Sequence, residues 1–247
     1  MNDRTYSIEA QTRFWNDWNS ANREHASSLP EVVARQADTV LGWMGDTATE
    51  RPRILEVGCG VGWLSRRLAA LGDVTAVDLS DEVISRARQR HPEVSFVAGD
   101  FLTLAIETES YDVVVSLEVL AHVVDQPAFV SKVARCLRPG GCFMMSTQNR
   151  FALSRWSEVV PQADGQLRNW VDAKTLRGLL QRYLEVVSLS SIVPVGDRGL
   201  LRWVNSHKLN RIAELCVSRE RINAWKERLF LGHTLMALAR KDGRQPR

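Results

Sequence analysis

Cysteines and long apolar runs are scarce in this chain. Its 247 residues include four cysteines, and no two of them are separated by only two residues. We therefore expect reduced thiols in a cytoplasmic protein, and neither a disulfide framework nor a zinc site. No stretch of about 18 apolar residues occurs, so the sequence predicts no membrane span. The first six residues lack the apolar core of a secretory signal, and we expect none.

Two common nucleotide-binding motifs are also missing. A phosphate-binding P-loop needs a Gly-Lys-Ser/Thr sequence after its first glycines, and the chain has none there. The dinucleotide fingerprint G-x-G-x-x-G would require a glycine at position 63, where the chain has Trp63. An indole at the start of a helix leaves little room for a pyrophosphate. The glycines of this chain therefore point to another kind of nucleoside.

The most informative segment is a strand that runs into a glycine-rich turn. Residues 54–57 predict a buried strand, and a helix is expected directly afterwards over residues 63–71. Three glycines let the backbone between them bend sharply and approach a ligand closely: Gly58, Gly60 and Gly62. Asp78 ends the next apolar run, 20 residues after the first of these glycines. Its carboxylate can accept from both hydroxyls of a ribose, which is typical of nucleoside binding.

With these motifs the chain resembles the class I S-adenosylmethionine (SAM)-dependent methyltransferases. The segments that carry the resemblance recur in the family's order over roughly residues 50 to 148: Glu56–Gly62, Asp78–Ser80, Ala98–Phe101, Tyr111–Ser116 and Leu137–Gly141. The resemblance implies SAM as the cofactor. It also implies an α/β fold with a doubly wound, seven-stranded and mostly parallel sheet. The alternative is a module that keeps this fold without the reaction.

The resemblance assigns cofactor contacts in the first half of the chain. The glycine turn, Gly58, Cys59, Gly60 and Gly62, is expected to pass under the methionine part of SAM. Glu56 is expected to receive the ammonium of the cofactor, directly or through water. The alternative for Glu56 is a structural ion pair with Arg53 or Arg66.

Further contacts are expected at the ends of the next strands. Asp78, followed by Leu79, is expected to bind the ribose, and Asp100 and the Phe101 backbone N–H to bind the adenine. The alternative for Asp100 is a helix cap. Ser116 and Leu117 end the fourth strand, where ligands of parallel sheets lie. Nearer the N-terminus, Arg13 is expected to meet the methionine carboxylate, from a segment whose aromatic residues either cover the cofactor or simply pack: Tyr6, Phe14, Trp15 and Trp18.

Short apolar strands alternate with amphipathic helices along the chain, which indicates a parallel sheet covered on both faces. Strands are expected near 53–57, 73–78, 94–98, 111–116, 141–147, 184–192 and 234–239, and helices over 8–20, 30–44, 63–71, 81–90, 126–137 and 171–182. By resemblance, the last strand lies antiparallel between its two predecessors. Ser80 and Asp125 are expected to cap helices, and Pro139–Gly141 to end the helix that starts at 126.

We expect one methyltransferase domain over residues 1–247. It would comprise a helical cap (1–47), a cofactor-binding half (48–148) and a substrate-side half (149–247) with a lid insert at about 196–230. Residues 1–134 carry 12 Lys and Arg against 20 Asp and Glu, whereas residues 135–247 carry 20 against 9. The basic half suggests an anionic substrate or a peripheral membrane contact, and the alternative is an ordinary solvated surface. Basic residues alternate with apolar ones in the lid: Arg198, Arg202, Lys208 and Arg211.

The segment after the fourth strand contains the candidate catalytic residues Glu118 and His122. This region looks like the ubiquinone-biosynthesis O-methyltransferase branch, whose members carry a Glu-x-x-Glu-His metal motif. Ala121 replaces the second acid here, so we expect no metal. His122 is the best candidate for a general base, because its ordinary pKa lies near neutral pH. The alternatives are a structural histidine bonded to a carbonyl, or a base at His207 or His233.

The sequence predicts a SAM-dependent methyltransferase (EC 2.1.1.-) that O-methylates a small-molecule or lipid-like hydroxyl. The acceptor would be anionic or lipophilic. Alternatives are N- or C-methylation of a small molecule, methylation of RNA or protein, and a non-catalytic module. We expect no nucleic-acid partner, because no nucleic-acid-binding module or basic tail is visible. The chain is expected to act as a monomer or homodimer.

Overall fold

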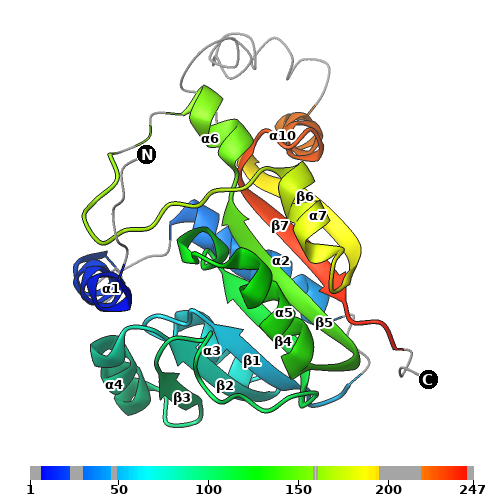
Figure 1. Cartoon of the computed structure of the whole chain (residues 1–247). Coiled ribbons are helices and arrows are strands. Elements are labelled where there is room, and N and C mark those ends of the chain that lie inside the picture. The colour runs from blue at the N-terminus through cyan, green and yellow to red at the C-terminus, as the bar shows by residue number, and fades with distance from the viewer. Residues whose placement is uncertain are drawn as a thin grey trace.

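The fold is a seven-stranded sheet with helices on both faces (Figure 1). The computed structural model describes residues 7–22, 30–45, 49–157, 159, 161–194 and 218–243. The strands run in the order β3-β2-β1-β4-β5-β7-β6. Their bounds are β1 Arg53–Val57, β2 Asp73–Asp78, β3 Ser95–Ala98, β4 Tyr111–Leu117, β5 Leu137–Gln148, β6 Glu185–Pro194 and β7 Gly232–Arg240.

The sheet is parallel except at one edge. Strand β1 pairs in parallel with β2 and β4, β2 with β3, and β4 with β5. Strand β7 pairs antiparallel with both β5 and β6, and so lies between its two predecessors, as predicted. From β1 the strands follow one another outward to β3 on one side, and from β4 they continue outward on the other side, so the strand order reverses between β1 and β4. Ligands of doubly wound sheets bind at such a point, beyond the carboxyl ends of the strands.

Alternate residues of each strand face opposite helical layers, because side chains alternate along a strand. On one face Leu55 and Val57 join a core with α5 and α7, which lie in front of the sheet in Figure 1. On the other face Ile54 joins a core with α2, α3 and α4. The helices of the described chain are α1 Ile8–Asn22, α2 Glu31–Met44, α3 Trp63–Ala69, α4 Asp81–Arg90, η1 Leu120–His122, α5 Gln126–Cys136, α6 Arg150–Trp156, α7 Ala173–Leu180 and α10 Arg219–Arg228.

The bounds of the predicted elements agree with the structure to within two residues, except at the start of β5, and one of the two predicted helix caps differs. Strand β5 begins at Leu137 rather than at 141, because Leu137 already pairs with Tyr111, and α5 therefore ends before Pro139–Gly141. Ser80 occupies the N-cap position of α4, but its hydroxyl makes no capping bond. Asp125 does cap α5, by accepting from the Ala128 N–H at 2.9 Å.

Two helices were not predicted, η1 and α6, whereas α10 lies within the lid insert, for which helical structure was expected. Helix α6 is capped by Asn149, which accepts from the Phe151 N–H. The four basic residues named above for the lid insert lie at 198–211, outside the described residues, whereas α10 is described. No helix of the described residues combines the length and apolar character that a membrane crossing requires.

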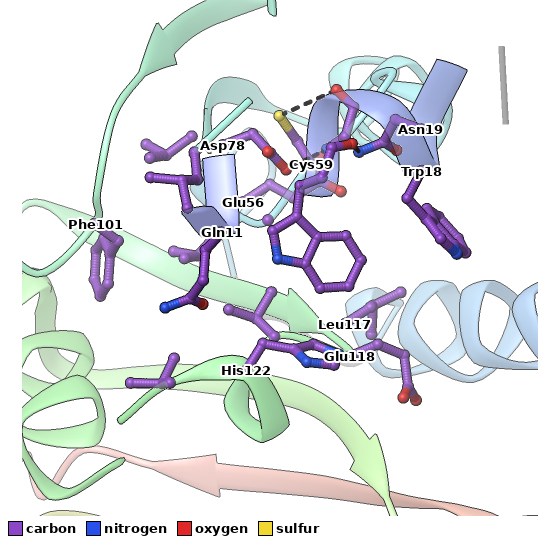
Figure 2. A pocket seen from close by; sticks show the side chains of 18 of the residues that line it. Gln11, Trp18, Asn19, Glu56, Cys59, Asp78, Phe101, Leu117, Glu118 and His122 are labelled. Carbon is purple, nitrogen blue, oxygen red and sulfur yellow. Dashed lines mark hydrogen bonds between the residues drawn. The ribbon is translucent and has the colours of Figure 1, made fainter. Parts of the chain in front are cut away.

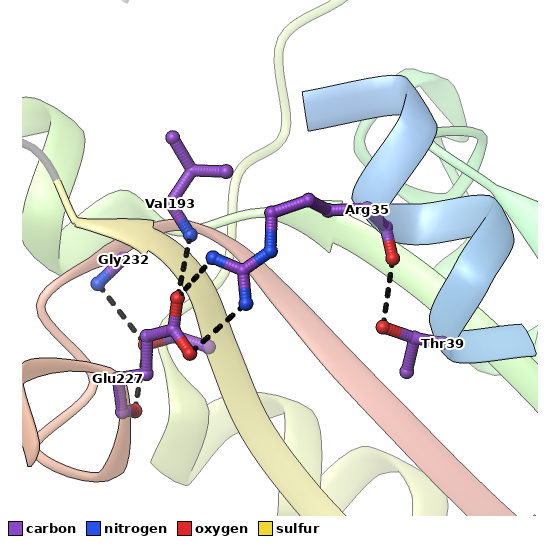
Figure 3. A network of polar contacts seen from close by, with 6 residues as sticks. Arg35, Thr39, Val193, Glu227 and Gly232 are labelled. Carbon is purple, nitrogen blue, oxygen red and sulfur yellow. Dashed lines mark hydrogen bonds and ion pairs between the residues drawn. The ribbon is translucent and has the colours of Figure 1, made fainter. Parts of the chain in front are cut away.

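An ion pair joins α10 to α2 and β6 (Figure 3). The Arg35 guanidinium donates to both carboxylate oxygens of Glu227, at 2.5 and 3.2 Å, and the Val193 N–H donates to the same carboxylate at 3.2 Å. The side chain of Glu227 is 15% exposed, so this contact is partly shielded from water. The pair fixes the first half of α2, which borders the cavity described below.

We expect Glu227→Ala to lower the free energy of unfolding by about 1.5–3 kcal/mol, because three hydrogen bonds to a shielded carboxylate are lost together. Urea denaturation would measure this change. The matched control is Glu107→Ala, which removes an exposed partner of Arg53 and should have a clearly smaller effect, because exposed ion pairs are weakened by solvent. Equal losses in the two variants would show that the contact made by Glu227 is no stronger than an ordinary surface pair.

Candidate active site

A cavity of about 510 Å³ lies at the carboxyl ends of β1, β2 and β4 (Figure 2). Its size is within the range of cofactor and small-molecule sites. Helices α1 and α2 and the loops after the strands complete its walls. Of the predicted site residues, eleven line it: Glu56, Gly58, Cys59, Gly60, Asp78, Leu79, Asp100, Phe101, Leu117, Glu118 and His122.

The glycine turn depends on missing side chains at two positions. Gly58 has φ +81°, and a Cβ there would come within 2.1 Å of the Val119 side chain. Gly62 has φ +80°, and its Cβ would meet the Phe96 ring at 2.9 Å. Gly62 therefore faces the packed core rather than the cavity, and it lies outside the lining. The backbone N–H groups of Gly58 and Cys59 both donate to the Val77 carbonyl, which joins the turn to β2.

Asp78 holds the glycine turn from the end of β2. One carboxylate oxygen accepts from the Gly60 N–H at 2.7 Å, and the other accepts from the Ser80 N–H at 2.9 Å. Burial raises the pKa of Asp78, and the two backbone donors oppose this rise. Each carboxylate oxygen can accept a second hydrogen bond, so the group can bind a diol while it supports the turn.

Glu56 is a buried acid at the centre of the same region, with 4% of its surface exposed. The Ser65 hydroxyl donates to its carboxylate at 2.5 Å. Burial raises the pKa of Glu56 to about 8, and the nearby Asp78 charge adds to this rise. Arg53 instead pairs with Glu107, and among the described residues Glu56 has no ion pair. A buried acid that lacks a counter-charge favours a cationic ligand.

The loop after β3 forms another end of the cavity. Asp100 accepts from the Leu102 N–H at 2.9 Å, which stabilises the turn that follows it. Phe101 packs edge-on against Phe129 with ring centroids 5.3 Å apart. The buried Lys132 ammonium donates to the Leu102 and Leu104 carbonyls and so holds the loop from beneath. Asp100 thus has a local structural bond and also faces the cavity.

His122 lies in η1, at the base of the cavity (Figure 2). Its Nδ1 is 2.6 Å from the Leu167 carbonyl oxygen. A carbonyl can only accept, so Nδ1 carries the hydrogen and Nε2 keeps a lone pair. Burial lowers the pKa of His122, while the Leu167 contact opposes this effect. The Trp15 ring packs edge-on against the imidazole at 4.6 Å. The histidine is therefore neutral near pH 7, with one fixed tautomer.

Glu118 follows β4 in an unusual backbone conformation, with φ +62°. Its N–H donates to Ser146, and its carboxylate accepts from the Gln36 amide at 2.5 Å and from the Ser146 hydroxyl at 3.1 Å. Figure 2 shows this carboxylate pointing toward a neighbouring helix rather than toward Asp78. Non-glycine residues with positive φ are often found at functional sites. The geometry gives Glu118 a role in joining α2 to the end of β4.

Three predicted site residues lie elsewhere. Arg13 is exposed on α1, and neither it, Gly62 nor Ser116 lines the cavity. Ser116 is buried in β4, and its hydroxyl has no hydrogen-bond partner among the described residues. Of the two alternative histidines, His233 lines the cavity and burial lowers its pKa, whereas His207 is outside the described residues.

Amide side chains of the cavity wall were missed in the sequence. They come from α1, α2, the end of β5 and the loop before α7: Gln11, Asn19, Gln36, Gln148 and Gln166. The spacing of Gln11, Trp15 and Asn19 places them on one face of a helix and could have indicated a polar contact surface. All charged side chains that line the described cavity are acidic, since no Lys or Arg of the described residues lines it.

The chain is similar to known methyltransferases in sequence. A family model described as a methyltransferase domain matches residues 55–145. The ubiquinone biosynthesis O-methyltransferase of Burkholderia vietnamiensis is 32% identical over 181 residues, which cover 65% of this chain and 78% of that protein. A probable SAM-dependent methyltransferase of Mycolicibacterium smegmatis is 38% identical over 102 residues, 41% of this chain and 40% of that protein. The chain spans about two fifths of the length of the first curated relatives that it matches.

Solved structures share the fold at low sequence identity. The N-methyltransferase NodS of Bradyrhizobium japonicum, in complex with S-adenosylhomocysteine, matches with a TM-score of 0.63 and 17% identity, over 94% of this chain and 98% of that one. The [4+2]-cyclase SpnF matches with a TM-score of 0.62 and 16% identity, over 95% of this chain and 94% of that one. These likenesses show the fold alone, because one fold hosts different reactions.

Proposed function

The chain belongs to the class I SAM-dependent methyltransferases, and from this premise we propose that it methylates a hydroxyl group of a small, uncharged molecule. The single observation that supports this proposal best is the fixed tautomer of His122. The Leu167 carbonyl holds the hydrogen on Nδ1, which leaves Nε2 as a proton acceptor in the wall of the cavity. A neutral hydroxyl needs such an acceptor, because it is a poor nucleophile until its proton leaves.

The described residues fit SAM in shape and in charge. The absence of a side chain at Gly58 allows Val119 to pack against the glycine turn, and the turn lines the cavity with Gly58, Cys59 and Gly60. The acidic side chains around the cavity suit a ligand that carries a sulfonium and an ammonium. Within this proposal Glu56 receives the ammonium, Asp78 the ribose hydroxyls and Asp100 the adenine. Cys59, Leu79 and Leu117 line the cofactor, while Gly62 shapes the turn from the core side.

When bound, SAM supplies an electrophilic methyl group, whose bond to sulfur breaks with its electron pair going to sulfur as the acceptor oxygen takes the methyl. The chain's own residues orient the acceptor and move its proton. Nε2 of His122 takes the hydroxyl proton and becomes an imidazolium, which then releases it to water. The Leu167 carbonyl stabilises this imidazolium through Nδ1, and the ring of Trp15 limits its motion and excludes water.

The acceptor is proposed to be uncharged and largely apolar. The described cavity offers no cation to an anionic group, and much of its wall is apolar, including Trp15, Trp18, Val33 and Val123. O-methylation agrees with the name of the Burkholderia vietnamiensis relative. An uncharged acceptor differs from the anionic one that the basic half of the sequence suggested. That charge lies largely outside the cavity wall described here.

Product analysis tests the proposal directly. The protein would be incubated with SAM carrying a deuterated methyl group and a panel of uncharged phenols, alcohols and amines, with mass spectrometry to locate the label. The proposal predicts the label on oxygen. Transfer to nitrogen alone, or no transfer to any member of the panel by protein that binds SAM, would contradict it.

The raised pKa of Glu56 predicts a proton release on cofactor binding. In the ligand-free protein this acid holds a proton at pH 7, because its pKa is about 8. A bound ammonium lowers that pKa, so each molecule of SAM should displace up to about one proton. Calorimetric titrations in buffers with different ionisation enthalpies count the protons. The Glu56→Gln variant is the control, and an equal proton count in both proteins would refute the assignment.

A further inference from the structure

Gln11 is a buried polar side chain that the proposed chemistry does not use. It lies in α1 with 4% of its surface exposed and lines the cavity. No hydrogen bond to its amide is found within the described chain. Figure 2 shows the amide directed into the cavity, in the region between Phe101 and His122. The protein encloses nearly all of this residue but leaves its amide open to the cavity without a protein partner, so the amide is placed to bind a ligand there.

The position of Gln11 along α1 indicates which part of the cavity it serves. Near one end of the helix, Asn19 approaches the glycine turn, since its Oδ1 would lie 3.1 Å from a Cβ on Gly60. One turn earlier, Trp15 packs on His122. Gln11 lies one further turn away, about 6 Å along the helix axis at the usual rise. It is therefore displaced from the glycine turn along α1, and its amide lies on the Phe101 side of the candidate base (Figure 2).

The chemistry of this region restricts what Gln11 can bind. An amide both donates and accepts, so it recognises an uncharged group such as a hydroxyl, an ether or a carbonyl. Ile8, three residues before Gln11 on the same helix, also lines the cavity, as does the apolar Val124. Gln166 also lines the cavity, but its side-chain oxygen already accepts from Arg168. The Gln11 amide is therefore available to both accept from and donate to an oxygen function of a ligand.

We propose that Gln11 forms a specificity subsite, in which its amide binds a second, uncharged oxygen of the acceptor while the reacting hydroxyl lies at His122. This inference rests on the proposed function. It adds a requirement on the acceptor, namely two oxygen functions in one largely apolar molecule. Gln11 positions and selects the acceptor and takes no part in moving the proton.

Isosteric probes can test this subsite. The 2-, 3- and 4-methoxyphenols are compared with the matching ethylphenols, which have almost the same shape but lack the second oxygen. Affinity is measured by tryptophan fluorescence on protein saturated with S-adenosylhomocysteine, and kcat/KM is measured with SAM. We expect at least one methoxyphenol to bind about three- to tenfold more tightly than its ethyl partner, as for one hydrogen bond.

The variant Gln11→Met keeps the length of the side chain and removes its hydrogen bonds. We expect it to lose the preference for the methoxy probe, with an unchanged dissociation constant for S-adenosylhomocysteine and an unfolding midpoint at least as high as before. Gln181→Leu, at an exposed position on α7's C-terminal side, is the control and should keep the preference. A structural role for Gln11 would instead lower the midpoint.

The outcomes separate this proposal from the proposed function. Equal binding of both probe types by the unmodified protein, binding of neither, or an intact preference in Gln11→Met would overturn the subsite. If Gln11→Met lost as much affinity for S-adenosylhomocysteine as for the methoxy probe, the subsite would also be overturned, because the amide would then bind the cofactor. Preferential binding without methyl transfer would support the subsite and contradict the proposed function. Methyl transfer to oxygen without a preference for the methoxy probes would support the proposed function and contradict the subsite.

Discussion

Replacing His122 with alanine is expected to lower kcat by about 10²- to 10⁴-fold, the usual contribution of a general base. The dissociation constant for SAM should change less than about twofold, because the predicted cofactor contacts lie on β1, β2 and β3. Steady-state assays with an accepted phenol, together with a calorimetric titration of SAM, would measure both quantities. A loss of kcat with an unchanged dissociation constant would show that His122 takes part in proton transfer and not in cofactor binding.

The His122→Asn variant distinguishes a general-base role of His122 from a purely structural one. An asparagine amide can still donate toward the Leu167 carbonyl, but it cannot take a proton at neutral pH. We expect this variant to be as slow as His122→Ala. A His233→Ala variant tests the other histidine of the cavity and should keep most of the turnover. Near-normal turnover in His122→Asn would show that the ring is needed only for its bond to Leu167.

The pH dependence follows from the direction of the shift in the His122 pKa. Burial lowers this pKa below its ordinary value of 6.5, so the base is already unprotonated at neutral pH. With SAM saturating, so that Glu56 is already deprotonated, the ratio kcat/KM for the acceptor is expected to decline only as the pH passes through the lowered pKa of His122, at a lower pH than for a histidine with the ordinary value. The His122→Asn variant should lack this decline.

Replacing Asp78 with alanine is expected to weaken SAM binding by about 10²- to 10⁴-fold. Two charge-assisted hydrogen bonds to the ribose would be lost, at about 1.5–3 kcal/mol each. The Gly60 and Ser80 N–H groups would also lose their acceptor, which loosens the glycine turn. Calorimetric titration with SAM measures the effect, and urea denaturation checks that the variant remains folded.

Asp73→Ala is the matched control for Asp78. Asp73 is the first residue of the same strand, and its exposed carboxylate pairs with Arg51 at the opposite end from the cavity. Its replacement should leave the affinity for SAM unchanged. If Asp78→Ala bound SAM as tightly as the control did, Asp78 would have only a structural role in the turn.

Local sequence patterns were sufficient to predict most of the sheet. Strands β1 and β2 have the predicted bounds, because short apolar runs next to glycine or charged residues leave little choice of register. The start of β5 was missed for a physical reason. Pro139 and two glycines read locally as a helix stop, whereas the pairing of Leu137 with Tyr111 draws the segment into the sheet.

The details of the site depend on contacts between distant parts of the sequence. The Leu167 carbonyl that fixes the tautomer of His122 is 45 residues away from it, and the Gln36 amide that holds Glu118 is 82 residues away. No local pattern encodes such pairs. Arg13 was assigned to the cofactor by family resemblance, but it lies on the exposed face of α1. Gln11 and Trp15, on another face of the same helix, line the cavity instead.

The central claim is that the cavity at the carboxyl ends of β1 and β2 binds a sulfonium nucleoside. Titration of the unmodified protein with S-adenosylhomocysteine in a calorimeter tests it most directly. We expect saturable binding of one molecule per chain, with SAM competing for the same site. No saturable heat up to about millimolar ligand, equivalent to less than about 4 kcal/mol of binding free energy, would contradict it.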